Sequence, residues 1–140
     1  MAVKSASMKA NAAFFESLGA PLKSVRWSWG ATRLKDGAII LKVWNDEWRT
    51  EADGQKWVQI GFPSGTGNVN GWRERQEHIK AIESGAQCLL VMCEAEDVSA
   101  DPRTVASLNP RTLAVGGEIK REEGKTWIRV VGYKSIFEVG

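Results

Sequence analysis

The chain has 140 residues, of which 43% are hydrophobic and 26% charged, and its formal net charge is +2. This size and composition suit a single globular domain over residues 1–140 and argue against a second domain. No apolar run approaches the roughly 20 residues that a membrane-spanning helix needs. The amino-terminal segment lacks the apolar core of a signal peptide, so we expect a cytoplasmic protein without a membrane partner.

The first half of the chain predicts one helix followed by three strands. Apolar residues recur at helical spacing over residues 6–18, and Gly19 provides a stop. Strands are expected at 24–32 and 38–44, joined by the turn sequence "KDG", and a third strand at 55–61.

The middle of the chain predicts a loop, a second helix and a buried strand. The loop at 61–71, "GFPSGTGNVNG", carries no charge and suits a flexible connection or flap. The second helix is expected at 71–84. The apolar run at 87–94, "QCLLVMCE", predicts a strand that is buried on both faces.

The last part predicts a connection and a hairpin. The connection covers 97–112 and includes a short helical turn at 101–107, and the hairpin pairs 112–120 with 125–132 around "REEG". The expected elements therefore number six strands and two helices. They predict an α+β fold, with a twisted, mostly antiparallel sheet or a small open β-barrel and two α-helices.

The cysteines and the histidine of the sequence do not form a recognisable catalytic motif. Cys88 and Cys93 lie in one expected strand, roughly 16 Å apart and on opposite faces, so we expect two free thiols in a reducing compartment. His78 is the only histidine, which excludes two-histidine metal sites and the HNH and HExxH motifs. We therefore expect no metal, no cofactor and no catalytic residues. The open alternative is a small metal-dependent nuclease that uses Asp36, Asp46 and Lys42.

Tryptophan is unusually frequent, with seven residues of this type in the chain. In the expected strand at 24–32, Trp27 and Trp29 share a face with apolar residues, which predicts a place in the core. Three other tryptophans lie on the polar sides of their strands: Trp44 beside Lys42, Trp57 beside Gln59, and Trp127 beside Lys125 and Arg129. A base-stacking groove would use such rings, and a second core layer covered by a helix would use them equally.

Basic residues gather in the first third of the chain, where residues 1–35 hold six lysines and arginines against one glutamate. Such a surface can contact phosphate, although solvated charges give the same pattern. The candidate phosphate or base contacts are Arg26, Arg33, Arg73, Arg75 and His78.

Three segments carry a family resemblance: "VRWSWGATR–DGAIILKVWNDE", "ERQEHIKAIESGAQCLLVMCEAED" and "AVGGEI". They resemble bacterial and phage-borne modules that sit beside HNH nuclease domains in restriction-type proteins, over residues 12–130. Such modules are similar in design to PUA/EVE-like barrels, which hold a flipped, modified base in an aromatic pocket. The resemblance implies a role in restriction–modification or phage defence and a nuclease or host protein as a partner.

Together these observations favour a non-catalytic nucleic-acid-binding module that recognises modified or flipped bases in DNA. Trp44, Trp57 and Trp127 are the expected walls of the pocket. The alternatives are a protein-interaction module or inhibitor in phage defence, with exposed tryptophans as anchors, and the metal-dependent nuclease.

Overall fold

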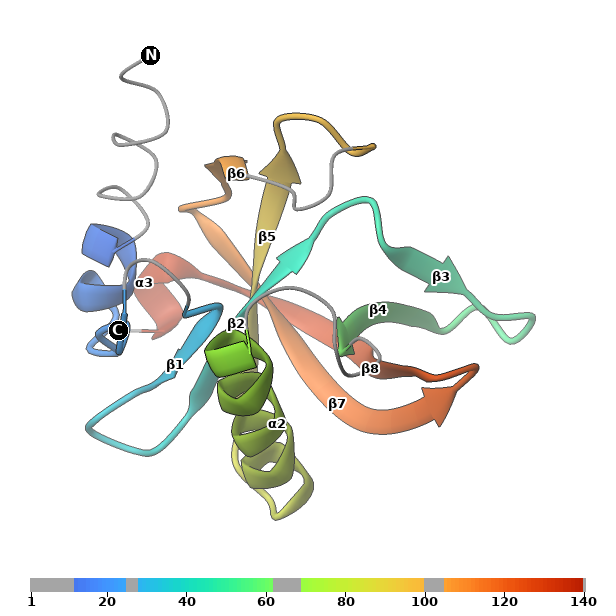
Figure 1. Cartoon of the computed structure of the whole chain (residues 1–140), viewed down its shortest axis with the longest axis horizontal. Helices are drawn as coiled ribbons and strands as arrows, with labels where there is room; N and C mark the ends of the chain where they lie inside the picture. The colour runs from blue at the N-terminus through green and yellow to red at the C-terminus, as the bar shows by residue number, and fades with distance from the viewer. Residues whose placement is uncertain (1–11, 25–27, 62–68, 100–104, 140) are drawn as a thin grey trace.

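The computed structural model describes residues 12–24, 28–61, 69–99 and 105–139. These residues form an α+β fold built on an open, mostly antiparallel sheet, in which the amino-terminal helical segment and α3 lie on one side and α2 lies across the front (Figure 1). The expected fold class is confirmed at this level. None of the helices in the described ranges is long and apolar enough to cross a bilayer.

The described ranges contain eight strands and three helical segments. A helical segment at residues 12–17 comes first. The remaining elements, in chain order, are β1 (Gly30–Thr32), β2 (Ile39–Trp44), β3 (Trp48–Thr50), β4 (Lys56–Gly61), α2 (Val69–Glu83), β5 (Cys88–Ala95), β6 (Val105–Leu108), β7 (Thr112–Glu122), β8 (Lys125–Ser135) and α3 (Ile136–Val139).

The strand order in the sheet is β1-β2-β5-β7-β8-β4-β3, and β6 pairs with β5. Only the β2–β5 pair is parallel among the pairs that the described residues form. β2 and β3 lie near opposite ends of this order, although only residues 45–47 separate them in the sequence. Such a short connection requires the two ends of the sheet to approach each other. The sheet therefore curls, and β4 lies close to β2.

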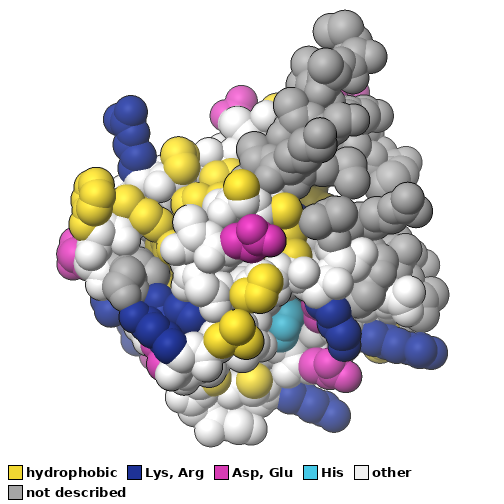
Figure 2. All heavy atoms as spheres, turned by 90° about the vertical axis from the view of Figure 1, so that its left-hand side faces the viewer, with side chains coloured by type: hydrophobic (Ala, Val, Ile, Leu, Met, Phe, Trp, Pro, Cys, Tyr) yellow, Lys and Arg dark blue, Asp and Glu magenta, His cyan; other side chains and the backbone are white. Residues whose placement is uncertain are grey.

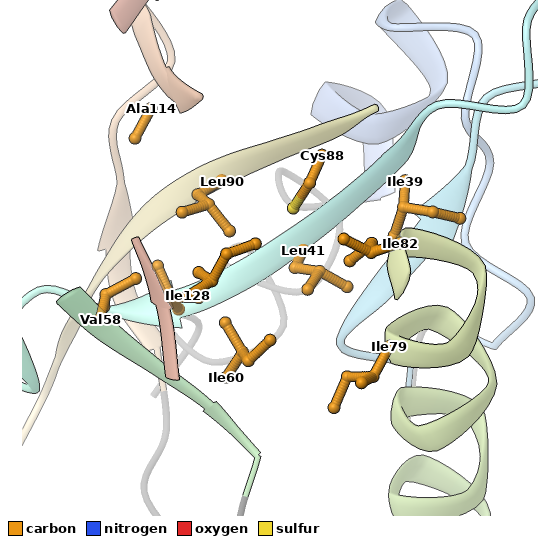
Figure 3. Packing of buried hydrophobic residues seen from close by; sticks show 11 residues of the cluster. Ile39, Leu41, Val58, Ile60, Ile79, Ile82, Cys88, Leu90, Ala114 and Ile128 are labelled. Atoms are coloured by element: carbon orange, nitrogen blue, oxygen red, sulfur yellow. The ribbon is translucent and has the colours of Figure 1, made fainter. Parts of the chain in front are cut away.

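The inner face of the curled sheet holds one buried cluster. It takes alternate residues from the strands, such as Leu41, Val58, Leu90 and Ile128, because successive side chains of a strand point to opposite faces. Ile79 of α2 belongs to the same cluster, and Figure 3 shows it pointing from the helix toward the strand side chains. Helix α2 thus covers the part of the core that the open sheet leaves uncovered.

A second cluster lies on the outer face of β2 and β5. Phe15 and Leu18, from the amino-terminal helical segment, pack there with Ile40, Leu89 and Val91. The prediction that the strand at 87–94 is buried on both faces is confirmed. Cys88 belongs to the inner cluster and Cys93 to the outer one, so the two free thiols do face opposite ways.

Several predicted elements were wrong in extent. The strand expected at 24–32 is limited to β1 within the described residues, and the Ser28 amide donates to the Ser24 carbonyl instead of pairing in the sheet. The helical turn expected at 101–107 was also wrong where residues are described, since 105–108 is β6. Strand β3 and helix α3 were missed, because segments of three or four residues are too short to show a period.

Candidate nucleic-acid interface

The three tryptophans predicted to share a pocket lie on two different surfaces. Trp44 is buried in the outer cluster, and its ring centroid lies 5.0 Å from that of Trp29. The Lys42 ammonium lies over the Trp29 ring at 4.9 Å. For Trp44 the second-core-layer interpretation is therefore confirmed, and this ring does not join Trp57 and Trp127.

Trp57 and Trp127 lie side by side on the outer face of the other half of the sheet. Strand pairing places six side chains there in two rows: Arg49, Trp57 and Arg129 in the first, and Gln59, Trp127 and Lys120 in the second. Directly paired residues of antiparallel strands share a face. We call these six residues the tryptophan face.

Each tryptophan of this face is covered by a cation from one of the two strands, β7 and β3, that flank β8 and β4. The Lys120 ammonium, from β7, lies 4.1 Å from the Trp57 ring centroid. The Arg49 guanidinium, from β3, lies 4.6 Å from the Trp127 ring centroid. Only 6% of Trp57 and 9% of Trp127 is exposed, and among the described residues the long side chains of Lys120 and Arg49, rather than a helix, lie over these rings.

Two glutamates hold the cations in place. Arg49 pairs with Glu51 at 3.1 Å and with Glu122 at 2.9 Å, and Lys120 pairs with both of the same carboxylates. We call Arg49, Glu51, Lys120 and Glu122 the ion-pair network. It joins β3 to β7 across the two strands that carry the tryptophans.

The ion pairs of the network shift the pKa values of its four members toward their charged forms. Hydrogen bonds from Lys120 lower the pKa of Glu51 and of Glu122, with Arg49 contributing to both. The bond to Glu51 raises the pKa of Lys120. Burial disfavours the charge on Arg49, yet its bonds to the two glutamates raise its pKa. All four groups are charged at neutral pH.

The tryptophan face also holds buried hydrogen-bond donors that have no acceptor among the described residues. They are the indole N–H groups of Trp57 and Trp127 and the Nε–H groups of Arg49 and Arg129. Buried polar groups in proteins are nearly always paired, so each unpaired group needs an explanation. Water or a bound ligand can supply the acceptors on this face.

Arg75, predicted to contact phosphate, lies inside the fold. Its Nη1 donates to the Ile60 carbonyl at 2.6 Å, and its Nη2 donates to the carbonyls of Trp29 and Lys42, each at 2.9 Å. Burial lowers its pKa to about 10, which leaves it charged at neutral pH. The guanidinium therefore connects β4 to β2 and to the segment before β1. β2 and β4 face each other across the opening of the curled sheet, where no strand pair joins them among the described residues.

The other predicted phosphate contacts do not gather at one place. Arg33 is buried and forms a two-bond ion pair with Asp36 that shapes the β1–β2 connection. Arg73 is exposed on α2. Arg26 lies outside the described residues.

His78 lines a separate hollow of about 320 Å³ between α2 and β1, together with Lys23, Thr32, Glu74 and Glu77. Figure 2 shows the histidine, in cyan, at the surface near basic and acidic side chains. Burial lowers the pKa of His78 to about 4, helped by Arg75 and Lys23, so the imidazole is neutral at pH 7. Burial raises the pKa of Glu74, whose carboxylate accepts from the Ser28 hydroxyl.

Sequence reasoning missed four members of the tryptophan face and its ion-pair network: Arg49, Glu51, Lys120 and Glu122. Alternation within the strand ending at 122 places Lys120 and Glu122 on one face, a signal that could have been used. The contribution of Arg49 and Glu51 could not be found, because β3 was not predicted as a strand.

The residues suggested for a metal-dependent nuclease are not assembled. Asp36 is engaged by Arg33, and the ammonium of Lys42 lies between the rings of Phe15 and Trp29. In the described ranges, no three histidine, cysteine or acidic residues come close enough to hold a metal ion.

Comparison with known proteins found no relative of this chain. No protein-family model matches the chain, and neither the curated proteins nor the solved structures include a significant match.

Proposed function

We propose that this protein is a non-catalytic nucleic-acid-binding module and that the tryptophan face is its contact surface. The observation that carries the proposal is the pair of rings, Trp57 and Trp127, that lie on one face of the sheet under the cations Lys120 and Arg49. Nucleic acids offer both complements: phosphate oxygens accept hydrogen bonds, and bases stack on aromatic rings.

The energies are compatible with binding. The ion pairs over the rings are partly exposed, so solvent screens them and each contributes little to stability. A base stacked on an aromatic side chain contributes about 1–3 kcal/mol. Stacking together with phosphate contacts can therefore offset the loss of the contacts that cover Trp57 and Trp127.

Charge reversal at Lys120 tests the proposal. Lys120→Glu should weaken binding of a labelled DNA oligonucleotide by about tenfold and reduce the slope of affinity against salt, since one phosphate contact is lost. Fluorescence anisotropy between about 50 and 200 mM salt measures both quantities. Lys80→Glu makes the same charge change on the exposed side of α2 and is the matched control. Equal losses in the two variants would exclude the tryptophan face as the contact surface.

The finer part of the proposal is recognition of modified or flipped bases. Two rings that accept any base do not select one, so selection would need polar groups that read the edge of a base. Gln59, in the row of Trp127, carries such a group, although it is buried and its Nε2 donates to the Gly61 carbonyl at 3.2 Å, a bond that a base would have to replace. Binding of matched oligonucleotides with and without base modifications tests this part separately.

A second candidate function, a protein-interaction module, rests on a different surface. Val131, Tyr133 and Phe137, from β8 and α3, are 50%, 57% and 93% exposed. Exposed aromatic residues often anchor protein interfaces. Tyr133→Ser with Phe137→Ser should abolish binding of a protein partner and leave DNA binding unchanged. Lys120→Glu should weaken DNA binding and leave binding of the protein partner unchanged.

A further inference from the structure

In the ion-pair network, two cations share the same two carboxylates. Arg49 and Lys120 each contact the same two carboxylates, Glu51 and Glu122. Carboxylate and phosphate oxygens accept the same charge-assisted hydrogen bonds from arginine and lysine. The two glutamates therefore hold the positions on these cations that phosphates of a bound strand would take.

The same cations cover the rings that a base would need. Lys120 and Arg49 lie over Trp57 and Trp127 at 4.1 and 4.6 Å, and neither ring is more than 9% exposed. A base can stack here only if the cation over the ring moves. The paired bases of a duplex are already stacked on their neighbours, so an unpaired base suits such a covered ring better.

We propose that the tryptophan face binds single-stranded nucleic acid by exchange, in which phosphates replace Glu51 and Glu122 on Arg49 and Lys120 and unpaired bases stack on Trp57 and Trp127. This inference rests on the proposed function and adds the class of ligand and the role of the two glutamates. They compete with the ligand, and they keep the rings covered in its absence.

The geometry supports exchange because all four side chains of the network are partly exposed. The side chains of Glu51 and Glu122 are 32% and 47% exposed, and those of Arg49 and Lys120 are 26% and 27% exposed. An incoming phosphate can therefore reach the cations as well as the carboxylates that it would replace. The indole N–H groups of Trp57 and Trp127 lie on the same face and can donate to a ligand that enters.

Removal of the competing charges tests the exchange. The double variant Glu51→Gln/Glu122→Gln should bind an unstructured single-stranded oligonucleotide about tenfold more tightly than the wild-type protein. The matched control, Glu83→Gln/Glu94→Gln, removes two negative charges elsewhere, one of them paired with Arg121. It should gain less than about twofold, because its carboxylates do not compete at the rings.

Three ligands separate stacking from charge attraction: the single strand, its duplex, and inorganic polyphosphate, which has phosphates but no bases. The single strand should bind most tightly and should shift the indole N–H resonances of Trp57 and Trp127 in NMR spectra. Polyphosphate that binds as tightly as the single strand, or a duplex that binds more tightly, would overturn the inference.

These experiments distinguish failure of the exchange from failure of the proposed nucleic-acid-binding function. If the wild-type protein binds nucleic acid through Lys120 but the Glu51→Gln/Glu122→Gln variant gains no more than its control, the exchange is wrong and the proposed function stands. If the wild-type protein binds no nucleic acid at low salt, the proposed function and the exchange both fail.

Discussion

At the scale of single residues, position in the fold changes what a side chain can do. Arg75 and Lys120 are both cations. The guanidinium of Arg75 donates hydrogen bonds to three backbone carbonyls inside the fold, whereas the ammonium of Lys120 lies over an aromatic ring near the surface. His78 would titrate near pH 6.5 in an open chain, but burial next to Arg75 keeps it neutral. A list of basic residues therefore overstates the cations that can reach a ligand.

His78 should make stability depend on pH. Its pKa is about 4 when folded and near 6.5 when unfolded. Between these values the unfolded chain binds the extra proton, so stability is fully present above about pH 6.5 and falls as the pH drops toward 4. The loss can reach about 3 kcal/mol, at 1.36 kcal/mol per pKa unit.

Urea unfolding of the wild-type protein and of His78→Gln across this pH range measures the effect. Glu74 faces the same hollow and has a raised pKa, which acts in the opposite direction. The difference between the two proteins isolates the histidine, because Glu74 is present in both. Parallel pH curves for the two proteins would show that His78 does not titrate as its burial requires.

At the scale of elements, periodicity predicted the long segments well and the short ones poorly. Helix α2, strand β5 and the β7–β8 hairpin lie close to the predicted ranges, since each is long enough to show its period. Strand β6 forms because β5 offers it a partner along Cys93–Ala95, a reason that is not local to its sequence. The same holds for β3, which pairs with β4.

The β1–β2 pair depends on a glycine. A Cβ atom added at Gly30 would lie 2.7 Å from the Ile40 carbonyl oxygen and 2.8 Å from Cδ2 of Leu41. Gly30→Ala should therefore lower the free energy of unfolding by about 1–3 kcal/mol. Gly132→Ala is the control, because nothing lies within 4 Å of its added Cβ. Equal thermal unfolding midpoints for the two variants would contradict the tight packing of β1 on β2.

At the scale of the whole molecule, one buried side chain spans the opening of the sheet. Hydrogen-bonded pairing runs from β1 through to β3, but no strand pair joins β2 to β4 among the described residues. The guanidinium of Arg75 bonds to carbonyls on both sides of that opening. The inner cluster lies behind it and is completed by Ile79 and Ile82, from the same helix.

Because Arg75 bridges this opening, its replacement should lower the stability of the protein. Arg75→Leu leaves three carbonyls without their donor and should destabilise the protein by about 3–5 kcal/mol in urea unfolding. Arg75→Lys should rescue part of this loss, since one ammonium cannot reproduce the planar geometry of the guanidinium. Arg73→Leu, at an exposed position on the same helix, should change stability by no more than about 0.5 kcal/mol. Similar losses at the two arginines would contradict the bridging role.

The sequence by itself determined which side of each strand is polar, and it placed Trp57 and Trp127 correctly on the polar sides of β4 and β8. It also determined the double burial of β5 and the opposite faces of Cys88 and Cys93, because these properties depend only on alternation along one strand. The tertiary structure decided what covers each ring. Lys120 and Glu51 are 69 residues apart in the chain, and they meet only because the strand order brings β7 and β3 to either side of the tryptophans. Such contacts depend on how strands pair across the whole chain, and no local pattern encodes them.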